Sequence, residues 1–288
     1  MNLRKSLLPA GWYPRNRQEI VRFLAEALED GGPPANPAVA AAAPHAGWYY
    51  SGALAARAAA ALAGEAAPDT VAVLGGHLPA GVRPLFYMED AVETPLGVMN
   101  IDGEMRDALA EKFGGVSDRF ADNTVEVLLP LVHYFFPDSR LLALRVPAGA
   151  SAFDMGKTLY GVSAALGRRI KTLASTDLTH YGPNYGFSPR GSGRASLDWV
   201  REVNDRRFID AVVAGDREAV LRRAGEERSA CSAGAVLAAM GYAAAAGADN
   251  ATAKDAPAVL LAYGTSADRA EDVPASFVGY GAFAWFTG

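Results

Sequence analysis

The sequence has very little cysteine, since Cys231 is the only one among 288 residues. A single thiol excludes an internal disulfide and is typical of a protein from a reducing compartment. Long apolar runs are also missing: only a short apolar stretch precedes Pro9, and no window reaches transmembrane length without charge. We therefore expect a cytoplasmic protein without a secretory signal and without a membrane partner.

A large excess of positive charge is likewise missing. Lys and Arg total 27 against 32 Asp and Glu, so the formal net charge is −5. Without a basic surplus to neutralise phosphates, nucleic acid is not an expected partner. Apolar residues are abundant, at 50% of the chain, which is enough for a large core. We expect a single domain over residues 1–288, and a homo-oligomer is left open.

Short β-type runs alternate along the chain with amphipathic or alanine-rich segments. Runs such as TVAVLGG and RLLALRV are apolar at successive positions, as in strands buried on both faces. The pattern predicts strands at residues 39–43, 70–74, 140–146, 171–176, 257–263 and 277–286. It predicts helices at residues 53–63, 103–113, 125–136, 152–169, 195–214, 217–224 and 232–246. This alternation indicates an α/β fold, a three-layer domain with a mostly parallel or mixed central sheet flanked by helices.

Three of the four histidines follow predicted strands. His45 follows the first in PHAGWYYSG, His77 the second in LGGHLP, and His180 the fourth in ASTDLTHYG. Strands of an open α/β sheet have their ligand-binding crevice at their carboxyl ends. His45 and His77 could therefore reach one metal ion through neutral imidazoles, although a lone loop histidine more often makes ordinary surface hydrogen bonds. His133 lies in an apolar helical stretch and is expected to be structural.

Cys231 offers a third metal donor. It precedes SAGAVLAAM, which is typical of a helix start, and a helix N-terminus favours the thiolate form that binds metal. Two imidazoles and a thiolate would leave an open coordination position, as in catalytic metal sites. The alternative is a small buried filler, the commoner fate of a free cysteine.

Two further groups of residues are candidates for the surroundings of this site. Asp177 and His180 lie three residues apart, so the carboxylate could orient or charge the imidazole in a proton shuttle; an unrelated turn-capping Asp is the alternative. Trp48, Tyr49 and Tyr50 follow His45 and could form pocket walls. Core packing at a strand-to-helix junction is the alternative for these rings.

These motifs resemble those of the Memo family. PHAGWYYSG, LGGHLP, NTVEVLLPL, STDLTHYG, the helix start at Cys231 and the closing SFVGYGAFAWF occur in the family's order, from about His45 almost to the C-terminus. Family members share the fold of the class III extradiol dioxygenases, which cleave catechol rings with non-haem iron. The resemblance implies that His45, His77 and Cys231 are metal ligands and that Asp177 and His180 line the pocket.

The sequence also departs from the family pattern. Gly76 stands where the family has the first of two adjacent histidines, and Asn123 replaces a common histidine. Asn123 is expected to line the substrate pocket together with Trp48 and Tyr49. Glu126 is retained, and we expect it on a helix surface. Because pocket donors decide which substrate groups are satisfied, these changes leave the family's substrate unassigned here.

The predicted function is a metal-binding, non-haem-iron-dioxygenase-like oxidoreductase that takes a small-molecule or peptide ligand. The cofactor is a divalent metal ion, iron in the first place; copper and zinc are alternatives because a thiolate is softer than a carboxylate. A second hypothesis is a cysteine hydrolase or amidase, with Cys231 as nucleophile, His180 as base and Asp177 as orienter. A third is a non-catalytic module that binds a peptide or metabolite.

Overall fold

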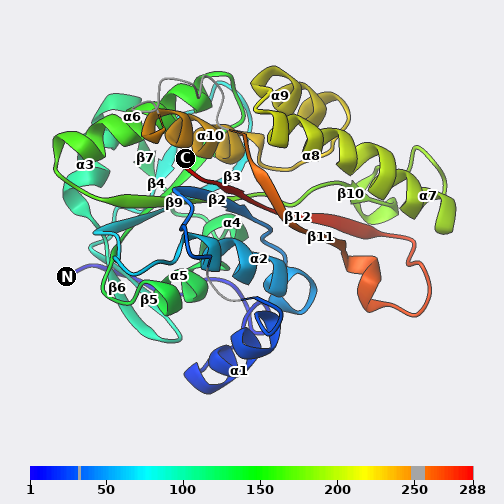
Figure 1. Ribbon diagram of the computed structural model, residues 1–288, viewed down its shortest axis with the longest axis horizontal. Helices are drawn as coiled ribbons and strands as arrows, with labels where there is room; N and C mark the ends of the chain where they lie inside the picture. The colour runs from blue at the N-terminus through cyan, green and yellow to red at the C-terminus, as the bar shows by residue number, and fades with distance from the viewer. Residues whose placement is uncertain (32–33, 248–256, 288) are drawn as a thin grey trace.

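The computed structural model describes residues 1–31, 34–247 and 257–287 (Figure 1). Within these residues, the main sheet has nine strands, in the order β10-β12-β2-β9-β3-β8-β4-β7 with β11 paired to β12. Their bounds are β2 Ala40–Ala43, β3 Thr70–Leu78, β4 Leu85–Phe86, β7 Val116–Ser117, β8 Arg140–Pro147, β9 Ile170–Ser175, β10 His180–Tyr181, β11 Val259–Thr265 and β12 Phe277–Trp285. A smaller sheet joins β1 (Leu3–Arg4), β5 (Ala91–Thr94) and β6 (Gly97–Asn100).

The main sheet is mixed. Strands β2, β9, β3 and β8 run parallel to one another, whereas β12 is antiparallel to β2 and β4 is antiparallel to β8. The parallel strands have buried residues on both faces, which explains their nearly continuous apolar sequences. The predicted α/β architecture, a mixed sheet flanked by helices, is confirmed.

Helices cover both faces of the sheet (Figure 1). Alternate side chains of one strand point to opposite faces: Ala41 and Ala43 of β2 pack in a core with α1, α2 and α5, whereas Ala40 and Ala42 pack in a core with α3, α6, α8, α9 and α10. The helix bounds are α1 Arg17–Ala27, α2 Trp48–Leu62, α3 Gly103–Phe113, α4 Asn123–Glu126, α5 Leu129–Phe135, α6 Ser151–Ala165, α7 Arg194–Trp199, α8 Asp205–Ala214, α9 Arg217–Glu226 and α10 Ala233–Ala246.

All six predicted strands occur, with ends shifted by up to a few residues, but two predicted helices are interrupted. The segment 125–136 is divided into α4 and α5, because the ring of Pro130 would clash with the carbonyl four residues earlier in a continuous helix. The segment 195–214 contains a π-helical turn, Val200–Asn204, between α7 and α8. Helix α1 was not predicted, although the Asn16 side chain caps it by accepting the Glu19 N–H.

Helices α6 and α10 make a close contact through two glycines. A Cβ on Gly156 would lie 1.9 Å from the Ala238 carbonyl oxygen, and one on Gly241 would lie 1.9 Å from that of Phe153. The two backbones approach each other only because these residues carry no side chain. This contact holds α10, and with it the residues just before its first turn, against the sheet. None of the described helices is long and apolar enough to cross a membrane.

Candidate metal centre

His45 lies two residues after the end of β2 and is almost completely buried, at 1% exposure. Its backbone N–H donates to Asp177 Oδ1 at 2.7 Å, which fixes the chain leaving the strand. Its Nδ1 is 2.8 Å from Ser175 Oγ on the neighbouring strand β9. With Nδ1 engaged in this way, Nε2 is the ring nitrogen available to a ligand.

His77 lies within the last residues of β3, so the prediction that it follows the strand is wrong by two residues. The pairing of β3 with β8 shifts register between Gly75 and Leu78, and His77 has a positive φ of 58°. An irregularity of this kind re-aims a side chain at the edge of a sheet. His77 Nδ1 lies 3.1 Å from Asp122 Oδ2, which leaves its Nε2 directed at the cluster.

The backbone before His77 explains the glycine at position 76. A Cβ on Gly76 would lie 2.1 Å from Ser232 Oγ and 2.2 Å from Ser232 Cβ. No side chain fits there unless Ser232 moves, so the space of a first histidine is filled by the residue after Cys231. The departure at Gly76 therefore leaves the position of His77 intact.

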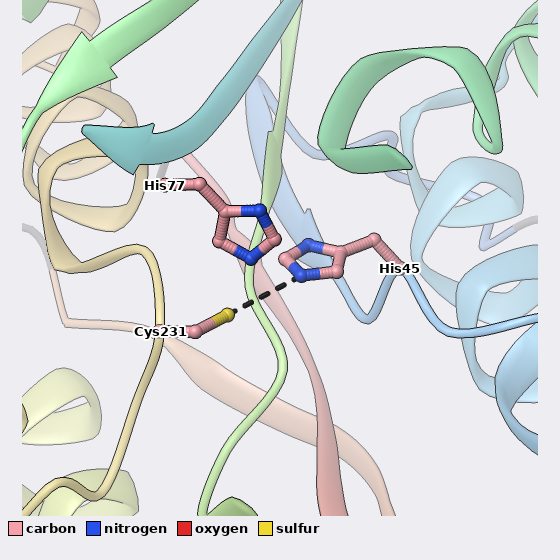
Figure 2. Close-up of side chains that lie close together, drawn as sticks. All are labelled: His45, His77 and Cys231. Carbon is pink, nitrogen blue, oxygen red and sulfur yellow. Dashed lines mark hydrogen bonds between the residues drawn. The ribbon is translucent and has the colours of Figure 1, made fainter. Parts of the chain in front are cut away.

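Cys231 directly precedes Ser232, the N-cap residue of α10, close to the position predicted from the sequence. Its Sγ accepts the Asp177 backbone N–H at 3.3 Å and lies 3.3 Å from His45 Nε2. Figure 2 shows the two imidazoles and the thiol pointing toward one another from three separate segments. One donor atom from each of His45, His77 and Cys231 lies within 4.8 Å of the other two.

These separations fit a shared metal ion. Metal–nitrogen and metal–sulfur bonds of about 2.1 and 2.3 Å at tetrahedral angles put neighbouring donors roughly 3.5 Å apart. The second contacts of the histidines fit as well, because ligating imidazoles usually donate their other N–H to a carboxylate, a hydroxyl or a carbonyl. Asp122 and Ser175 supply those contacts here.

The charges of the cluster favour a thiolate. Burial would raise the pKa of Cys231, but the imidazoles of His45 and His77 hold it well below its ordinary value. Burial opposes a charged His77, yet hydrogen bonds to Asp122 and Cys231 raise the pKa of His77 to about 10. For His45, the Asp177 carboxylate and the thiolate outweigh burial and raise the pKa. These shifts favour a thiolate at Cys231 and protonated imidazoles at His45 and His77.

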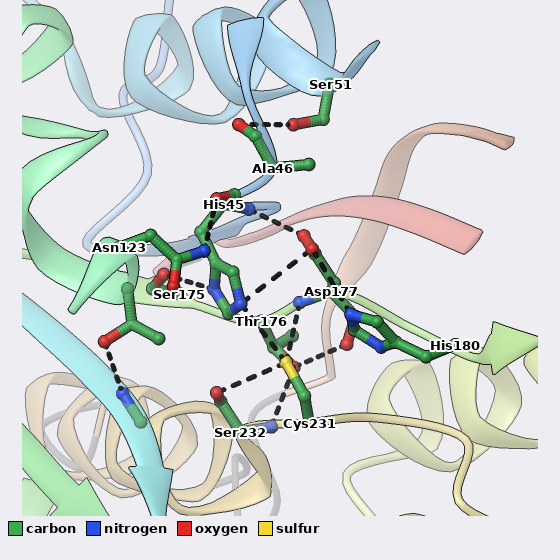
Figure 3. Close-up of polar contacts among 12 residues, drawn as sticks. His45, Ala46, Ser51, Asn123, Ser175, Thr176, Asp177, His180, Cys231 and Ser232 are labelled. Carbon is green, nitrogen blue, oxygen red and sulfur yellow. Dashed lines mark hydrogen bonds and ion pairs between the residues drawn. The ribbon is translucent and has the colours of Figure 1, made fainter. Parts of the chain in front are cut away.

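Asp177 and His180 lie beside the cluster (Figure 3). Asp177 Oδ2 is 3.9 Å from His45 Nε2 and 4.0 Å from His180 Nε2. Burial raises the pKa of Asp177, against the attraction of the two imidazoles. His180 is partly exposed, and its Nδ1 lies 3.2 Å from the Leu178 carbonyl oxygen. Asp177 therefore lies between the buried imidazole of His45 and the partly exposed imidazole of His180.

Comparison with known proteins assigns the chain. A family model described as Memo-like protein matches residues 4–284. The chain belongs to the Memo family. A MEMO1 family protein of Desulfurococcus amylolyticus is 27% identical over 99% of this chain and all of that protein, and one of Thermococcus onnurineus is 28% identical over 96% and 97%. A crystal structure of an uncharacterized Escherichia coli K12 protein aligns at 11% identity and TM-score 0.43, covering 75% of this chain and 86% of that one.

In this Memo family protein, the cluster opens into a cavity with two lobes. An apolar lobe of about 400 Å³ and a more polar lobe of about 370 Å³ share His77, Ala224, Ala230 and Cys231 in their walls. The polar lobe adds His180, Tyr185 and Arg228. The apolar lobe adds Leu78, Pro79, Ala148, Leu221, Gly225 and Ala233.

The residues expected to line a substrate pocket lie elsewhere. Trp48 is buried, donates from Nε1 to the Val127 carbonyl at 3.0 Å, and packs against Phe23. Tyr49 is 63% exposed, and neither ring lines the two lobes. Asn123 Nδ2 donates to the His45 carbonyl at 2.9 Å, so it supports the backbone of a proposed ligand. Asn123 therefore contacts the backbone of the site and not the cavity.

Sequence reasoning missed several residues around the site. Asp122 holds His77 and lies 3.2 Å from the Arg145 guanidinium, which in turn donates to the Gly76 carbonyl. The only available signal for Asp122 was its N-cap position before NTVE. Arg228 gave no signal, because it lies in a charge-rich stretch that resembles a solvated helix face.

The prediction that Glu126 lies on a helix surface is wrong. Glu126 is 5% exposed, and its carboxylate accepts the backbone N–H groups of Leu7 and Leu8 and the hydroxyl of Tyr13. The N-terminal segment folds over α4 and covers it. A buried carboxylate with three donors is a structural anchor.

Proposed function

We propose that this Memo family protein binds a divalent metal ion through His45, His77 and Cys231 and uses it in an oxidoreductase reaction. Iron is the metal we favour, with copper or zinc as alternatives, because imidazole and thiolate ligands suit all three. The observation that carries the proposal is the convergence of one buried imidazole, one exposed imidazole and one thiol, whose donor atoms all lie within 4.8 Å of one another. We place this activity in the cytoplasm, where a lone cysteine stays reduced.

The surroundings favour a catalytic ion over a structural one. Structural sites are closed by four protein ligands, whereas catalytic sites keep a position for substrate or water. Among the described residues, the cluster offers three donors, and His77 and Cys231 both line the two-lobed cavity. A substrate in either lobe would thus lie next to the proposed ligands.

The protein's own residues have separate tasks in this proposal. A bound ion would supply Lewis acidity and, for iron or copper, electron transfer. His180 faces the polar lobe and can accept or release a proton at Nε2. Asp177 Oδ2 lies 4.0 Å from that nitrogen. Ser175 and Asp122 keep the two ligand rings in place through their Nδ1 atoms.

A thiol nucleophile is a second candidate function, and the 3.3 Å contact between Cys231 Sγ and His45 Nε2 favours it. A thiolate beside an imidazolium is the activated form of a cysteine nucleophile. The base in this version is His45, not His180, because among the described residues the hydrogen bonds of Cys231 include His45 but not His180. Asp177 then keeps the orienting role.

Metal analysis tests the proposal directly. The full chain, purified anaerobically without a histidine tag, is expected to hold about one metal ion per chain. The variant with His45→Ala, His77→Ala and Cys231→Ser together is expected to hold essentially none. His133→Gln is the matched control, because His133 pairs with Thr94 on β5 and should leave the metal content unchanged.

Alkylation of Cys231 separates the two functions. If the thiolate binds metal, iodoacetamide should modify Cys231 only after a chelator is added. If Cys231 is a nucleophile, the rate of alkylation should be high without a chelator.

In the metal analysis, a triple variant that retains stoichiometric metal would refute the metal site.

A further inference from the structure

Two residues of the polar lobe have unusual backbone conformations. Among the described non-glycine residues, His77 and Arg228 are those with positive φ, at 58° and 52°. Both line the polar lobe, although they are far apart in the sequence. The left-handed region costs energy for residues with a Cβ, and such residues concentrate at functional sites. His77 belongs to the proposed metal site, but that site gives no reason for the strain at Arg228.

The guanidinium of Arg228 is held at the wall of this lobe. Its Nη1 donates to the Gly186 carbonyl at 3.0 Å and its Nη2 to the Tyr185 carbonyl at 2.8 Å. Its Cζ lies 4.9 Å from the centre of the Phe187 ring. A guanidinium has five N–H groups, so these two contacts fix its place and leave donors free. Among the described residues, no carboxylate lies within ion-pair distance of Arg228, so its charge is not neutralised.

The adjoining lobe is lined by more apolar side chains and no arginine. Leu78, Pro79, Ala148 and Leu221 contribute to a largely apolar wall that meets the polar lobe at His77 and Cys231. Each lobe is within the size range of small-molecule sites. A molecule that fills both would carry an apolar arm at one end and an anionic group at the other, with its middle beside the cluster.

We propose that the cavity binds an organic carboxylate with an apolar arm, and that Arg228 holds the carboxylate. The planar fork of a guanidinium matches the two oxygens of a carboxylate. One arginine at the wall of the polar lobe matches the single charge of a monoanion better than the charge of a phosphate dianion. As a substrate class the carboxylate rests on the proposed function, but its binding does not require the metal.

The test uses the full chain, treated with chelator, and three probes: hexanoate, hexanol and acetate. Isothermal titration calorimetry measures their affinities. Hexanoate should bind at least about tenfold more tightly than hexanol or acetate, because it alone occupies both lobes. Arg228→Gln should weaken hexanoate about tenfold and leave hexanol unchanged. Ala148→Phe, which fills the apolar lobe, should weaken hexanoate and hexanol but leave acetate unchanged.

Arg194→Gln is the matched control, since Arg194 is an exposed arginine paired with Asp198 on α7. It should change none of the three affinities. Equal loss of hexanoate and hexanol in Arg228→Gln would mean that Arg228 only ties down the Tyr185 loop, and would overturn the proposal. So would absence of hexanoate binding, or binding that appears only when metal is restored.

The metal content of Arg228→Gln separates this proposal from the proposed function. It should equal that of the wild type, because Arg228 supplies no metal donor. If the wild type holds no metal in any preparation but binds hexanoate through Arg228, the proposed function fails and the carboxylate site stands.

Discussion

Asp205, the first residue of α8, shows how a single buried carboxylate supports the site without facing the cavity. Its Oδ1 accepts the Thr179 N–H at 3.0 Å, and its Oδ2 accepts the Tyr263 hydroxyl at 2.7 Å. A Cβ on Gly279 of β12 would lie 1.9 Å from Asp205 Oδ2, so this position opposite the carboxylate needs a glycine. Thr179 adjoins His180, and Asp205 therefore fixes the segment that carries the proposed proton carrier.

The shifted pKa of the Asp205 carboxyl predicts that the stability of the folded protein depends on pH. Burial raises the pKa of Asp205 to about 7 from an ordinary 3.8, although its hydrogen-bond donors favour the carboxylate. Between these two pH values the folded protein holds a proton that the unfolded chain has released. The contribution of Asp205 to the free energy of unfolding must therefore fall as pH rises, by up to roughly 1.4 kcal/mol per pH unit.

Urea unfolding of the wild type and of Asp205→Asn at pH 5 and pH 8 measures this effect. The amide cannot ionise, so the wild type should lose stability relative to the variant between the two pH values. Asp210→Asn, on the exposed side of the same helix, should follow the wild type. A wild type that gains stability relative to Asp205→Asn with rising pH would contradict the assignment.

Helices and strands contribute to the site by holding its residues on backbone segments that other hydrogen bonds anchor. Helix α4 carries Asn123, whose side chain donates to the His45 carbonyl, and follows Asp122, which holds His77. At the end of α4, Glu126 ties the helix to the N-terminal segment through Leu7 and Leu8. The N-terminal segment is thus connected to the proposed metal centre by one short helix.

Glu126→Gln is expected to destabilise the protein by about 1–3 kcal/mol, because the amide presents one acceptor oxygen to donors that now share two. Denaturant unfolding gives the free energy, and hydrogen exchange at Leu7 and Leu8 should speed up. Glu111→Gln, on the exposed face of α3, is the matched control and should change neither. Unaltered exchange at Leu7 and Leu8 in Glu126→Gln would show that the carboxylate does not anchor the segment.

In the molecule as a whole, the three proposed ligands come from segments far apart in the chain. His45 follows β2, His77 ends β3, and Cys231 lies between α9 and α10. The unfolded chain cannot hold these donors together, so a bound ion stabilises only the folded state. Metal binding should therefore raise global stability.

Thermal unfolding with and without chelator measures this linkage. At free metal about 100 times the dissociation constant, the folded state should gain about 2.7 kcal/mol, and chelation should remove it. The His45→Ala, His77→Ala, Cys231→Ser variant should unfold at the same temperature with and without metal. An equal metal response in that variant would place the ion elsewhere.

Much of the architecture followed from local patterns. The continuous apolar runs predicted β3 and β8 because strands buried on both faces need no polar alternation, and residues 103–113 were predicted with the bounds of α3. His45, His77 and Cys231 were singled out because strand ends and helix starts are local features, and the topology of parallel strands brings their ends to one edge. Membership of the Memo family, indicated by ordered motifs, is confirmed.

The remainder depended on contacts between segments distant in the chain. No local pattern distinguishes the buried Glu126 from a surface glutamate, because its partners Leu7, Leu8 and Tyr13 come from another part of the sequence. The bulge that re-aims His77 arises from the pairing of β3 with β8, and the fixed guanidinium of Arg228 depends on carbonyls more than forty residues away. Local propensity determines the helices and strands and the types of side chain at their ends. The burial, charge state and orientation of those side chains depend on contacts that exist only in the folded chain.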